Sequence, residues 1–599
     1  MRYTSLCLLT IVLAGCPTRA RLHGDDGGTP SDGSSDGGLS DLTGDVSDGT
    51  DGDGAIPAIT IVSPMSMTYA NGHVIVQVQV AGAAPTKVQL LRNDMAWQEL
   101  VPPFRFDWDT TPAPEGDYVL TATAMIGQDT VTSAPVTVSV DRTPPKVTLV
   151  TPAIGSTTVA LTAPIAVTFS EPIVASTVSD SAVVLSAGGA AVAATVGLAA
   201  DAKSLTVTIT DPKALTLPAD FTATVATTIT DRAGNQLAPL EMPWVWTVPA
   251  WIKLPALKTE LPPRLAIDGA RRPVVAYVTL DTVNANSVYD LRVARFEGSA
   301  WNTTMGAPTT TPDTARNGYS LALDSKGQPV VAWTETFAQT TVHVAAWTGS
   351  GWNTVFPALD AINDLGKDGS LPSVQVDKSD KPVVAWREVT GNFPTYDTYV
   401  ARWSGTAWTF LNGTGFQGGA GFERPLDGPK LVLDAQGNPW FGWSETGVGS
   451  GVASWSGTTW VRGQALIGGF TPYPVIDATG VPWIAAKSTD LHVLKWNSSM
   501  SNWLEAVSLP LTTSASWSAP RLALGPDGAP VVAWLDTSNG VRIGVARWTG
   551  TAWDNRFGVF NAGQNPPNNV VPELALDAQG TIWVAWQEGP AAQVWMSNY

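Results

Sequence analysis

Short apolar runs separated by turn residues recur along the C-terminal part of the chain. In residues 321–352 the runs are Leu-Ala-Leu-Asp, Val-Val-Ala-Trp, Val-His-Val-Ala-Ala-Trp and Gly-Ser-Gly-Trp, with a Gly-Gln-Pro turn after the first. A fixed period of such units is the sequence signature of a repeat architecture. The chain carries seven such units in all, and the other six begin near Pro263, Pro372, Pro429, Pro474, Pro520 and Pro572.

The turn after the first run holds an aspartate in six of the seven units. The six steps between residues 268 and 577 give a mean period of 51.5 residues. Each period contains four short runs rich in β-branched and aromatic residues and no long helical pattern. Four strands in about 40–50 residues are typical of a β-propeller blade. The turn positions are Asp268, Asp324, Asp377, Asp434, Asp477, Gly525 and Asp577.

The two ends of the repeat array complement each other. The last unit stops after its third run, at residues 594–597, and lacks the final Gly-x-x-Trp run. A matching run precedes the first unit at residues 251–254. Pairing this run with the strand around Trp595 would close the ring without an open sheet edge. We therefore predict a seven-bladed β-propeller over residues 250–599, with a last blade built from both ends of the array.

Two further modules precede the propeller. Residues 56–141 show alternating runs at 59–62, 74–78, 88–91, 118–122 and 136–140, separated by turn residues, which indicates an antiparallel sandwich. Residues 142–249 contain Val-Thr-Phe-Ser-Glu-Pro-Ile at 167–173, Asp-Arg-Ala-Gly-Asn at 231–235 and Trp-Val-Trp-Thr-Val at 244–248. These signatures resemble the bacterial Ig-like family of surface-layer proteins, which implies a spacer or adhesive sandwich. The predicted fold class is all-β: two Ig-like β-sandwiches followed by a seven-bladed β-propeller.

The N-terminus has the pattern of a secretory signal. Arg2 is followed by an apolar run over residues 6–13 and by Leu-Ala-Gly-Cys at 13–16. The last four residues resemble the bacterial lipobox, which implies removal of residues 1–15 and a diacylglycerol on the Cys16 thiol. An ordinary signal peptide is the alternative, whereas the apolar run is too short for a transmembrane anchor. We expect a lipid-anchored protein of the cell envelope, in the outer membrane or at the cell surface, that meets the membrane through this anchor only.

Charge and composition narrow the possible partners. The chain has 34 basic and 52 acidic residues, a balance that disfavours nucleic acid as a partner. Nine of the acids lie between Asp25 and Asp53, and we expect residues 16–55 to be a disordered, extended linker because they contain few apolar side chains. Cys7 and Cys16 are the only cysteines and the four histidines are scattered. We therefore expect no disulfide, no metal centre and no cofactor.

An acid recurs two residues after the tryptophan of the second run. Since strands alternate in direction, these positions lie on the opposite face of the propeller from the turn aspartates, which need no purpose beyond capping their own turns. A partial ring of carboxylates on that face could hold a cation or meet a basic ligand. The alternative is a solvated strand-end residue copied with the repeat. The candidate binding residues of this series are Glu335, Glu388, Glu445, Asp536 and Glu588, and the fifth unit has Lys487 instead.

Tryptophan is the other abundant side chain, with 26 in the chain and 22 of them at or after Trp251. Most belong to two regular series, in the second runs and at the starts of the fourth runs, which blade-to-blade packing explains. His343 and His492 occupy equivalent third-run positions and receive the same explanation. Trp517 lies outside both series and is a candidate for stacking on a sugar. Trp440 and Trp483 are further candidates.

No catalytic motif is present, neither a Gly-x-Ser-x-Gly elbow nor a His-Glu-x-x-His pair nor a phosphate loop. Arg264 and Arg521 are equivalent, but no third arginine completes a sialidase-like cluster. Our first hypothesis is a monomeric, non-catalytic protein whose propeller binds an extracellular or envelope protein or glycan. A glycosidase or lyase and a structural surface-coat component are the alternatives, since carboxylate separations cannot be read from a sequence.

Overall fold

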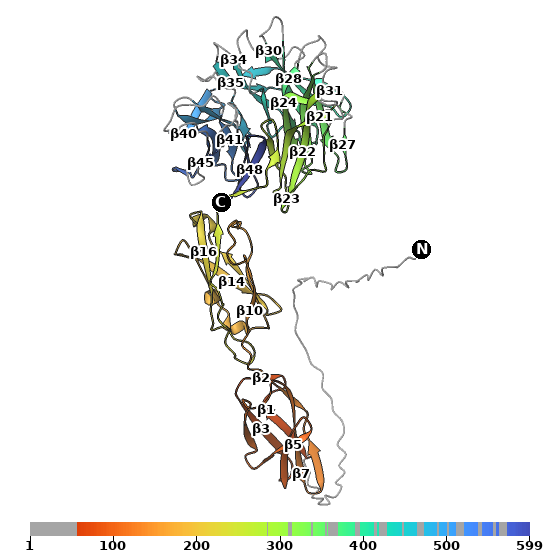
Figure 1. Ribbon diagram of the computed structural model, residues 1–599, viewed down its shortest axis with the longest axis vertical. Helices are drawn as coiled ribbons and strands as arrows, with labels where there is room; N and C mark the ends of the chain where they lie inside the picture. Colours follow the sequence, from red (N-terminus) through yellow and green to blue (C-terminus); the bar gives the residue numbers. More distant parts are fainter. Residues whose placement is uncertain are drawn as a thin grey trace, which may run out of the picture.

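The computed structural model describes most of the chain after residue 56. The described residues are 57–283, 286–308, 314–336, 340–353, 356, 369–389, 396–411, 416–417, 428–445, 449–463, 472–487, 490–499, 502–510, 520–536, 542–554, 559–561 and 572–598. The signal sequence, Cys16, the linker and Trp517 lie outside them. The described residues form β-strands and three short 3-10 helices, so the predicted all-β fold class is confirmed. Figure 1 shows two elongated modules in line, with a wheel of blades at the end of the second.

The first module is a sandwich of two sheets around one core. One sheet has the order β1-β3-β6 and the other β2-β9-β7-β4-β5, with β8 paired to β7. Val76, Leu90, Leu120 and Val138 are completely buried between them. All five predicted runs are strands, whereas the short, largely exposed β5 and β8 carry no alternating signal. The strands are β1 (Ala58–Ser63), β2 (Thr68–Ala70), β3 (His73–Ala81), β4 (Lys87–Arg92), β5 (Met95–Leu100), β6 (Arg105–Asp109), β7 (Gly116–Ile126), β8 (Asp129–Thr132) and β9 (Val136–Val140).

The second module is a sandwich of two four-stranded sheets, ordered β10-β11-β15-β14 and β13-β12-β16-β17. Phe221 and Trp246 stack in its core with ring centres 5.3 Å apart, and Trp244 is completely buried beside them. The elements are β10 (Val147–Thr151), β11 (Ile165–Phe169), η1 (Ala175–Thr177), η2 (Asp180–Ala182), β12 (Val183–Ala187), β13 (Ala190–Val192), β14 (Ala194–Leu198), β15 (Ser204–Ile209), η3 (Pro212–Ala214), β16 (Ala219–Val225) and β17 (Trp244–Val248).

The C-terminal region forms seven sheets of at least four strands from the described residues. The first six blades begin with β20, β24, β28, β33, β37 and β41, and the last combines β18 and β19 with β46–β48. The strands of blades 1 to 3 are β20 (Arg264–Ile267), β21 (Pro273–Val283), β22 (Asn286–Glu297), β23 (Ala300–Asn302), β24 (Thr314–Leu323), β25 (Pro329–Thr336), β26 (Thr340–Trp347), β27 (Trp352–Asn353), β28 (Gly369–Val376), β29 (Pro382–Val389), β30 (Tyr396–Trp403), β31 (Trp408–Phe410) and β32 (Phe416–Gln417).

The strands of blades 4 to 6 are β33 (Lys430–Leu433), β34 (Pro439–Glu445), β35 (Gly449–Trp455), β36 (Trp460–Arg462), β37 (Val475–Ile476), β38 (Pro482–Lys487), β39 (Leu491–Asn497), β40 (Asn502–Leu509), β41 (Arg521–Leu524), β42 (Pro530–Asp536), β43 (Arg542–Trp548), β44 (Trp553–Asp554) and β45 (Val559–Asn561). The last blade contains β18 (Trp251–Lys253), β19 (Leu257–Lys258), β46 (Glu573–Leu576), β47 (Ile582–Glu588) and β48 (Ala591–Ser597).

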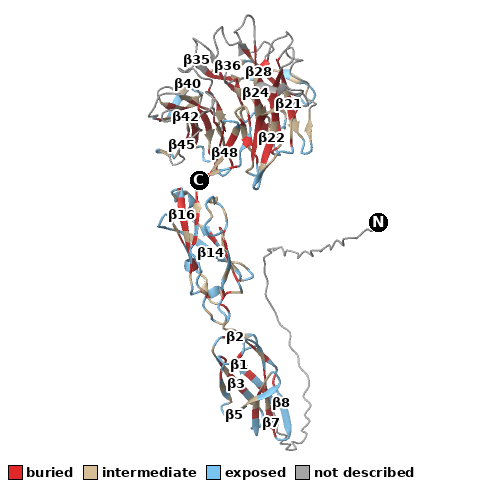
Figure 2. Cartoon of the chain, viewed as in Figure 1, coloured by how far each residue is buried: buried red, intermediate tan, exposed pale blue. Residues whose placement is uncertain are grey.

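Second strands are apolar on both faces because each blade lies between two others. On β25, Val331 and Trp333 pack with Val274 and Val293 of blade 1. Val330 and Ala332 point the other way and pack with residues of blade 3, among them Trp386. Buried residues accordingly run along the middle of the blades (Figure 2). Each Å² of apolar surface that such an interface buries stabilises the ring by about 25 cal/mol.

The ring closes through the pairing that the sequence predicts. Strand β18 lies antiparallel to β48, with Trp251 opposite Ser597 and Lys253 opposite Trp595. The innermost strands also contact one another in sequence, from β20 through β24, β28, β33, β37 and β41 to β46, and β46 contacts β20. The blades therefore surround a common axis that is lined by their first strands.

Polar contacts fix the two joints between the three modules. At the joint between the sandwiches, Asn71 Nδ2 donates to Asn235 Oδ1 at 3.0 Å, and Arg232 Nη1 donates to Tyr69 Oη at 3.2 Å. At the joint with the propeller, the buried Asn598 side chain accepts from Leu161 N at 3.1 Å and donates to Pro249 O at 2.5 Å. The sandwiches thus form a jointed stalk beneath one face of the propeller.

Candidate functional site

The propeller has two faces, which we name by their position relative to the stalk. The stalk-side face carries the turns between first and second strands, because Ile582, which follows the Asp577 turn, donates its N–H to Ser597 next to the stalk contact Asn598. The far face carries the ends of the second strands and the starts of the first strands. The predicted separation of turn aspartates from strand-end acids follows from this alternation.

The turn aspartates on the stalk-side face cap their own turns. Asp324 Oδ1, for example, accepts from Lys326 N at 2.9 Å and Gln328 N at 2.7 Å. The same pair of bonds, to the residues two and four positions later, recurs at Asp268, Asp377, Asp434, Asp477 and Asp577. This local role is the one that the sequence indicates.

Blade 6 is the exception, because it has no aspartate at this turn position. Gly525 occupies the aspartate position, and a Cβ there would lie 2.5 Å from Asp527 Oδ1. Asp527 caps the turn instead, accepting from Ala529 N at 3.2 Å and pairing with Arg547 at 2.7 Å. The glycine therefore makes room for a carboxylate that has moved two positions along the chain.

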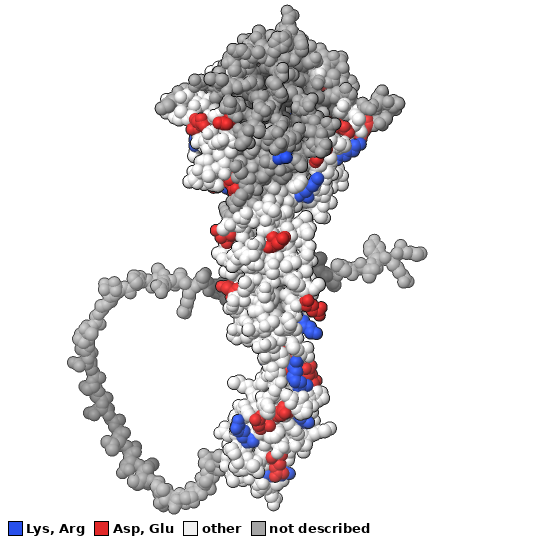
Figure 3. Space-filling model, turned by 60° about the vertical axis from the view of Figure 1, so that its left-hand side comes forward, with Lys and Arg blue, Asp and Glu red and all other residues white. Residues whose placement is uncertain are grey.

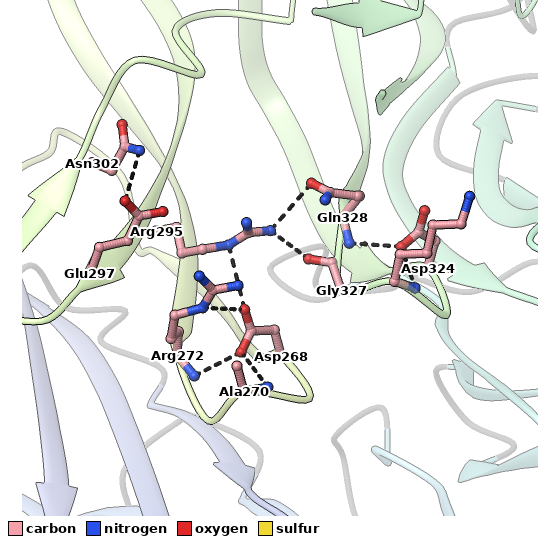
Figure 4. Close-up of polar contacts among 10 residues, drawn as sticks. Asp268, Ala270, Arg272, Arg295, Glu297, Asn302, Asp324, Gly327 and Gln328 are labelled. Carbon is pink, nitrogen blue, oxygen red and sulfur yellow. Dashed lines mark hydrogen bonds and ion pairs between the residues drawn. The ribbon is translucent and has the colours of Figure 1, made fainter. Parts of the chain in front are cut away.

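Further polar contacts at these turns join neighbouring blades. Figure 4 shows Arg295 of blade 1 reaching between Asp268 of its own blade and Gly327 of blade 2, whose carbonyl accepts from Arg295 Nη2 at 2.6 Å. Between blades 1 and 7, Arg271 Nε lies 2.7 Å from Asp577 Oδ2. Burial raises the pKa of Asp577, but hydrogen bonds from Arg271 and Thr581 outweigh it and hold that pKa below its usual value.

On the far face, two of the predicted acids are buried against tryptophan. Glu335 Oε1 accepts from Trp333 Nε1 at 2.9 Å, and Glu388 Oε1 accepts from Trp386 Nε1 at 2.8 Å. Only 7% of Glu335 and 4% of Glu388 is exposed. Residues two apart on a strand share a face, so the Trp-x-Glu spacing itself contained this signal. A ligand role for these carboxylates stays a prediction.

The other candidate residues are placed less completely. Glu588 is partly exposed at the end of β47, opposite Ala591. Glu445 and Asp536 end their strands opposite Gly449 and Arg542, and their side chains lie outside the described part of the structure, as does that of Lys487. Trp483 lies toward the stalk side, where its indole donates to Asp477 Oδ2 at 2.9 Å. Trp440 is the second residue of β34, at the position equivalent to Trp483, and lies opposite Val432.

The regular tryptophans pack between strands and blades, as predicted. Trp352, at the start of a fourth strand, meets Trp347 edge to face and donates to Met305 O of the previous blade at 2.7 Å. Each second-strand tryptophan faces a flat or absent side chain on the third strand. His343 stacks on Trp333 with ring centres 5.6 Å apart, whereas a Cβ on Gly544 would lie 2.3 Å from the Trp534 indole.

Seven equivalent side chains lie in or next to the innermost strands, toward the far face, and we call them the inner ring. Each lies four residues before the turn position of its blade. They surround the axis because the first strands contact one another around it. The inner ring consists of Arg264, Ser320, Ser373, Lys430, Tyr473, Arg521 and Glu573.

One arc of the inner ring is charged and aromatic. Glu573 Oε1 lies 3.0 Å from Arg264 Nη1 and 3.9 Å from Arg521 Nη2. The Arg521 guanidinium lies 3.3 Å from the centre of the Tyr473 ring, and Lys430 Nζ lies 4.7 Å from the same centre. Cations at such distances are attracted by the negative face of an aromatic ring. Among the described residues, this arc of the inner ring therefore brings together Arg264, Lys430, Arg521 and Glu573.

The other arc is made of hydroxyl groups. Ser320 Oγ accepts from Val374 N at 2.9 Å, and Ser373 Oγ accepts from Leu431 N at 3.0 Å. Next to Ser320, Tyr319 donates its hydroxyl to Pro262 O at 2.6 Å, and its carbonyl accepts from Arg264 Nε at 3.0 Å. Burial raises the pKa of Tyr319, more than Arg264 lowers it, so the hydroxyl remains protonated. Every blade thus touches the next through the inner ring.

The inner ring is hard to find in the sequence, because most of its residue types do not recur with the repeat. Arg264 and Arg521 stand out as an equivalent pair, but Lys430, Tyr473 and Glu573 differ from them in type. Their position could have identified them, because six of the seven inner-ring residues directly follow a proline. For the fifth unit that proline is Pro472, two residues before the Pro474 at which we placed its start.

Three carboxylates meet at the joint between the sandwiches. One oxygen each of Asp141, Glu171 and Asp231 lies within 4.8 Å of the others. Burial, followed by the charges of Asp141 and Asp231, raises the pKa of Glu171. Oxygen donors of this kind suit Ca²⁺, but Asn235 already satisfies the buried Asp231 with bonds from its N and Nδ2 at 2.9 and 2.8 Å. Figure 3 shows both signs of charge intermingled over the sandwiches.

Comparison with known proteins confirms one of the resemblances. Residues 141–248 match the bacterial Ig-like domain family, in agreement with the signatures of the second sandwich. A bacterial Ig-like domain suggests a surface or extracellular protein. No curated protein matches the chain. In the part of the chain that the structure describes, no helix has the length and apolar character to cross a membrane.

Several solved structures resemble parts of the chain. The WD40 β-propeller domain of Doa1 is 11% identical over 58% of this chain and 96% of that one, with a TM-score of 0.38. The periplasmic gluconolactonase PpgL of Pseudomonas aeruginosa is 12% identical over 54% and 91%, with a TM-score of 0.36. The endo-β-1,4-mannanase of Thermotoga petrophila is 19% identical over 15% of this chain, with a TM-score of 0.14, and the chain spans only 21% of that enzyme. At these values no function follows from the likeness.

Proposed function

We propose that the chain is an envelope lipoprotein, anchored through Cys16, whose propeller binds a glycan or a protein on its far face without catalysis. The observation that carries the proposal is the arrangement of the modules: the stalk joins one face of the propeller at Asn598, so the opposite face is directed away from it (Figure 1). Binding residues generally reside where a rigid scaffold presents varied side chains. The far face does so, because its inner ring holds five residue types at seven equivalent positions.

Binding is preferred to catalysis because of what the axis offers. Hydrolysis of a glycosidic bond needs two carboxyl groups on either side of the bond, about 5–10 Å apart. Among the described residues, the inner ring holds one acid, Glu573, and that acid is engaged by Arg264. The ring is therefore better suited to holding a ligand than to cleaving one.

A carbohydrate-active enzyme is the second candidate, and blade 3 provides its support. Glu388 and Asp397 lie directly opposite each other on neighbouring strands, and only 4% and 8% of them are exposed. Tyr399 lies two residues after Asp397 and shares its face of the sheet, and burial, then Glu388 and Asp397, raises the pKa of Tyr399. Two buried acids beside a tyrosine are the kind of groups that general acid–base catalysis uses.

Screening the full chain against a glycan array and a panel of envelope proteins tests the first candidate. We expect specific binding that survives in a Glu388→Gln, Asp397→Asn double variant. An assay of reducing ends and unsaturated sugars, run on the same glycans, tests the second candidate. Product formation that disappears in the double variant would replace binding with catalysis as the function.

The anchor requires its own experiment because it lies outside the described residues. Expression in a Gram-negative host with a radiolabelled fatty acid should label the wild-type chain and sediment it with membranes. A Cys16→Ser variant should be unlabelled and soluble, whereas Cys7→Ser, which lies within the signal, should behave as wild type. Equal labelling of the Cys16→Ser variant would contradict lipidation at this position.

A further inference from the structure

We propose that Asn71 is a site of spontaneous deamidation, and that its conversion to aspartate or isoaspartate loosens the joint between the two sandwiches. Asn71 directly follows β2, at the end of the first sandwich that lies next to the second (Figure 1). The proposal concerns the stalk and goes beyond the proposed function, so it is independent of what the far face of the propeller binds.

The reaction follows from the sequence Asn71-Gly72. The Gly72 backbone nitrogen loses its proton and bonds to Cγ of Asn71, the side-chain amide leaves as ammonia, and a succinimide ring remains. Water then opens the ring at either carbonyl, which yields aspartate or isoaspartate. Glycine favours the attack because it has no Cβ to hinder the ring and because its backbone adopts many conformations. Water is the only other reactant.

Solvent reaches both residues of the pair. Asn71 is exposed. Together with Gly72 it lines an open groove of about 640 Å³, which also includes Ala233 of the second sandwich. Water can therefore carry away the ammonia and hydrolyse the ring without any unfolding of the sandwich.

The fold does not itself require a glycine at position 72. The φ angle of Gly72 lies outside the left-handed region, and a Cβ built on it would meet no atom within 4 Å apart from its chain neighbours. An alanine fits this position. Gly72→Ala therefore slows the reaction without disturbing the joint, which makes it a clean test variant.

The joint, in contrast, requires an amide at position 71. Asn71 Nδ2 donates to Asn235 Oδ1 at 3.0 Å. Asn235 presents its oxygen to Asn71 because its own Nδ2 donates to Asp231 Oδ2 at 2.8 Å and to Asp141 O at 3.0 Å. Deamidation would bring a carboxylate oxygen against Asn235 Oδ1. Both atoms would then be acceptors, so the hydrogen bond between the sandwiches would be lost.

The charge of the product adds to this loss. Asp141, Glu171 and Asp231 already place three carboxylate oxygens within 4.8 Å of one another at the joint. A carboxylate at position 71 would be separated from Asp231 by the Asn235 side chain alone, and like charges at short range repel. Isoaspartate would in addition lengthen the backbone by one carbon directly after β2. The joint should therefore loosen as the molecule ages.

Ageing the full chain at mildly alkaline pH, followed by peptide mapping with mass spectrometry, tests the modification. We expect the peptide that contains residue 71 to gain one mass unit, because a hydroxyl group replaces the amino group, and to separate into aspartate and isoaspartate forms. Gly72→Ala should slow this change by about tenfold or more with an unchanged unfolding midpoint. If residue 71 stays unmodified in the folded chain while the peptide cut from it deamidates, the site assignment is overturned.

Hydrogen exchange of the full chain measures the consequence at the joint. Asp141 N donates to Ala70 O at 2.9 Å, so its exchange reports on a contact next to residue 71. We expect Asn71→Asp to speed exchange in the peptide that contains Asp141 by about fivefold or more, because a lost hydrogen bond and a like charge both favour opening. Asn71→Ala loses the bond alone and should have a smaller effect.

Gln128→Glu is the matched control for the added charge. Gln128 is an exposed amide in the turn between β7 and β8, and its substitution makes the same change from amide to acid. We expect this variant to exchange as the wild-type chain does at Asp141. If Asn71→Asp also exchanges as the wild type does, the modification leaves the joint intact and the proposed loosening is wrong.

Discussion

The two faces of the propeller differ in how much of the repeat they keep. On the stalk-side face one residue type fills the turn position in six of seven blades, whereas four residues earlier the inner ring uses five types for seven positions. The turn aspartate bonds to its own backbone, so the same residue serves every blade. An inner-ring residue must fit whichever side chain the next blade presents, so each junction has its own solution. A residue that bonds within its own turn is therefore the same in nearly every unit, whereas a residue that contacts the next blade differs from unit to unit.

The largest effect should come from a stalk-side residue that combines both kinds of task. Asp577→Ala removes two backbone bonds and the bridge from Arg271, and its side chain is 1% exposed. We expect the free energy of unfolding to fall by about 3 kcal/mol. Asp324→Ala, which loses only the two local bonds, should cost about 1–2 kcal/mol. Tryptophan fluorescence in urea measures both, and equal losses would show that the bridge between blades 1 and 7 is unimportant.

A smaller effect distinguishes packing from ligand binding at the strand-end acids. Glu335→Leu leaves the buried Trp333 N–H without its acceptor and should cost about 1–3 kcal/mol. Glu335→Gln keeps an oxygen acceptor and should cost less than about 1 kcal/mol. Urea titration of both variants measures the difference. If glutamine and leucine are equally harmful, the charge of Glu335 and not its hydrogen bond is what the blade requires.

Acid should weaken the stalk-side face by less than these deletions. Because the folded-state pKa of Asp577 is lowered, its ionised form stabilises the fold above the unfolded-state pKa of about 3.9, and this contribution disappears as pH falls through the folded value. We expect the unfolding midpoint to fall between pH 5 and pH 3, and to fall less in Asp577→Asn. An identical pH dependence in the variant would remove Asp577 from the explanation.

The smallest expected change in stability sharpens the contrast between the faces. Lys430→Met should alter the unfolding free energy by about 0.5 kcal/mol or less, because a partly exposed cation over an aromatic ring contributes little to stability. Differential scanning fluorimetry checks this, and a large drop in the unfolding midpoint would assign Lys430 to the scaffold.

The sequence was sufficient wherever structure arises from local pattern. The turn aspartates, the doubly apolar second strands and the run at residues 251–254 all follow from spacing, and the structure contains each of them. It was insufficient for contacts between different residue types far apart in the chain. Asn598 bonds with Leu161, 437 positions earlier, and nothing near either residue announces the contact.

The candidate site shows the same limit. Trp333 and Glu335 are close in sequence, so their hydrogen bond could be predicted from the spacing. Tyr473 and Arg521 meet only because the ring brings neighbouring first strands together. Their meeting depends on blade geometry, which the periodicity of one chain does not specify.

The shared last blade determines how tension would travel through the molecule. A pull between the stalk and a ligand held on the far face enters the wheel at β18, the segment directly after the second sandwich. That segment pairs with β48, so the force loads the seam where the first and last parts of the array meet. The Asn598 bonds to the stalk lie beside this seam and share the strain. The wheel is therefore loaded first at its own closure, and peeling β18 from β48 would be the step that opens it.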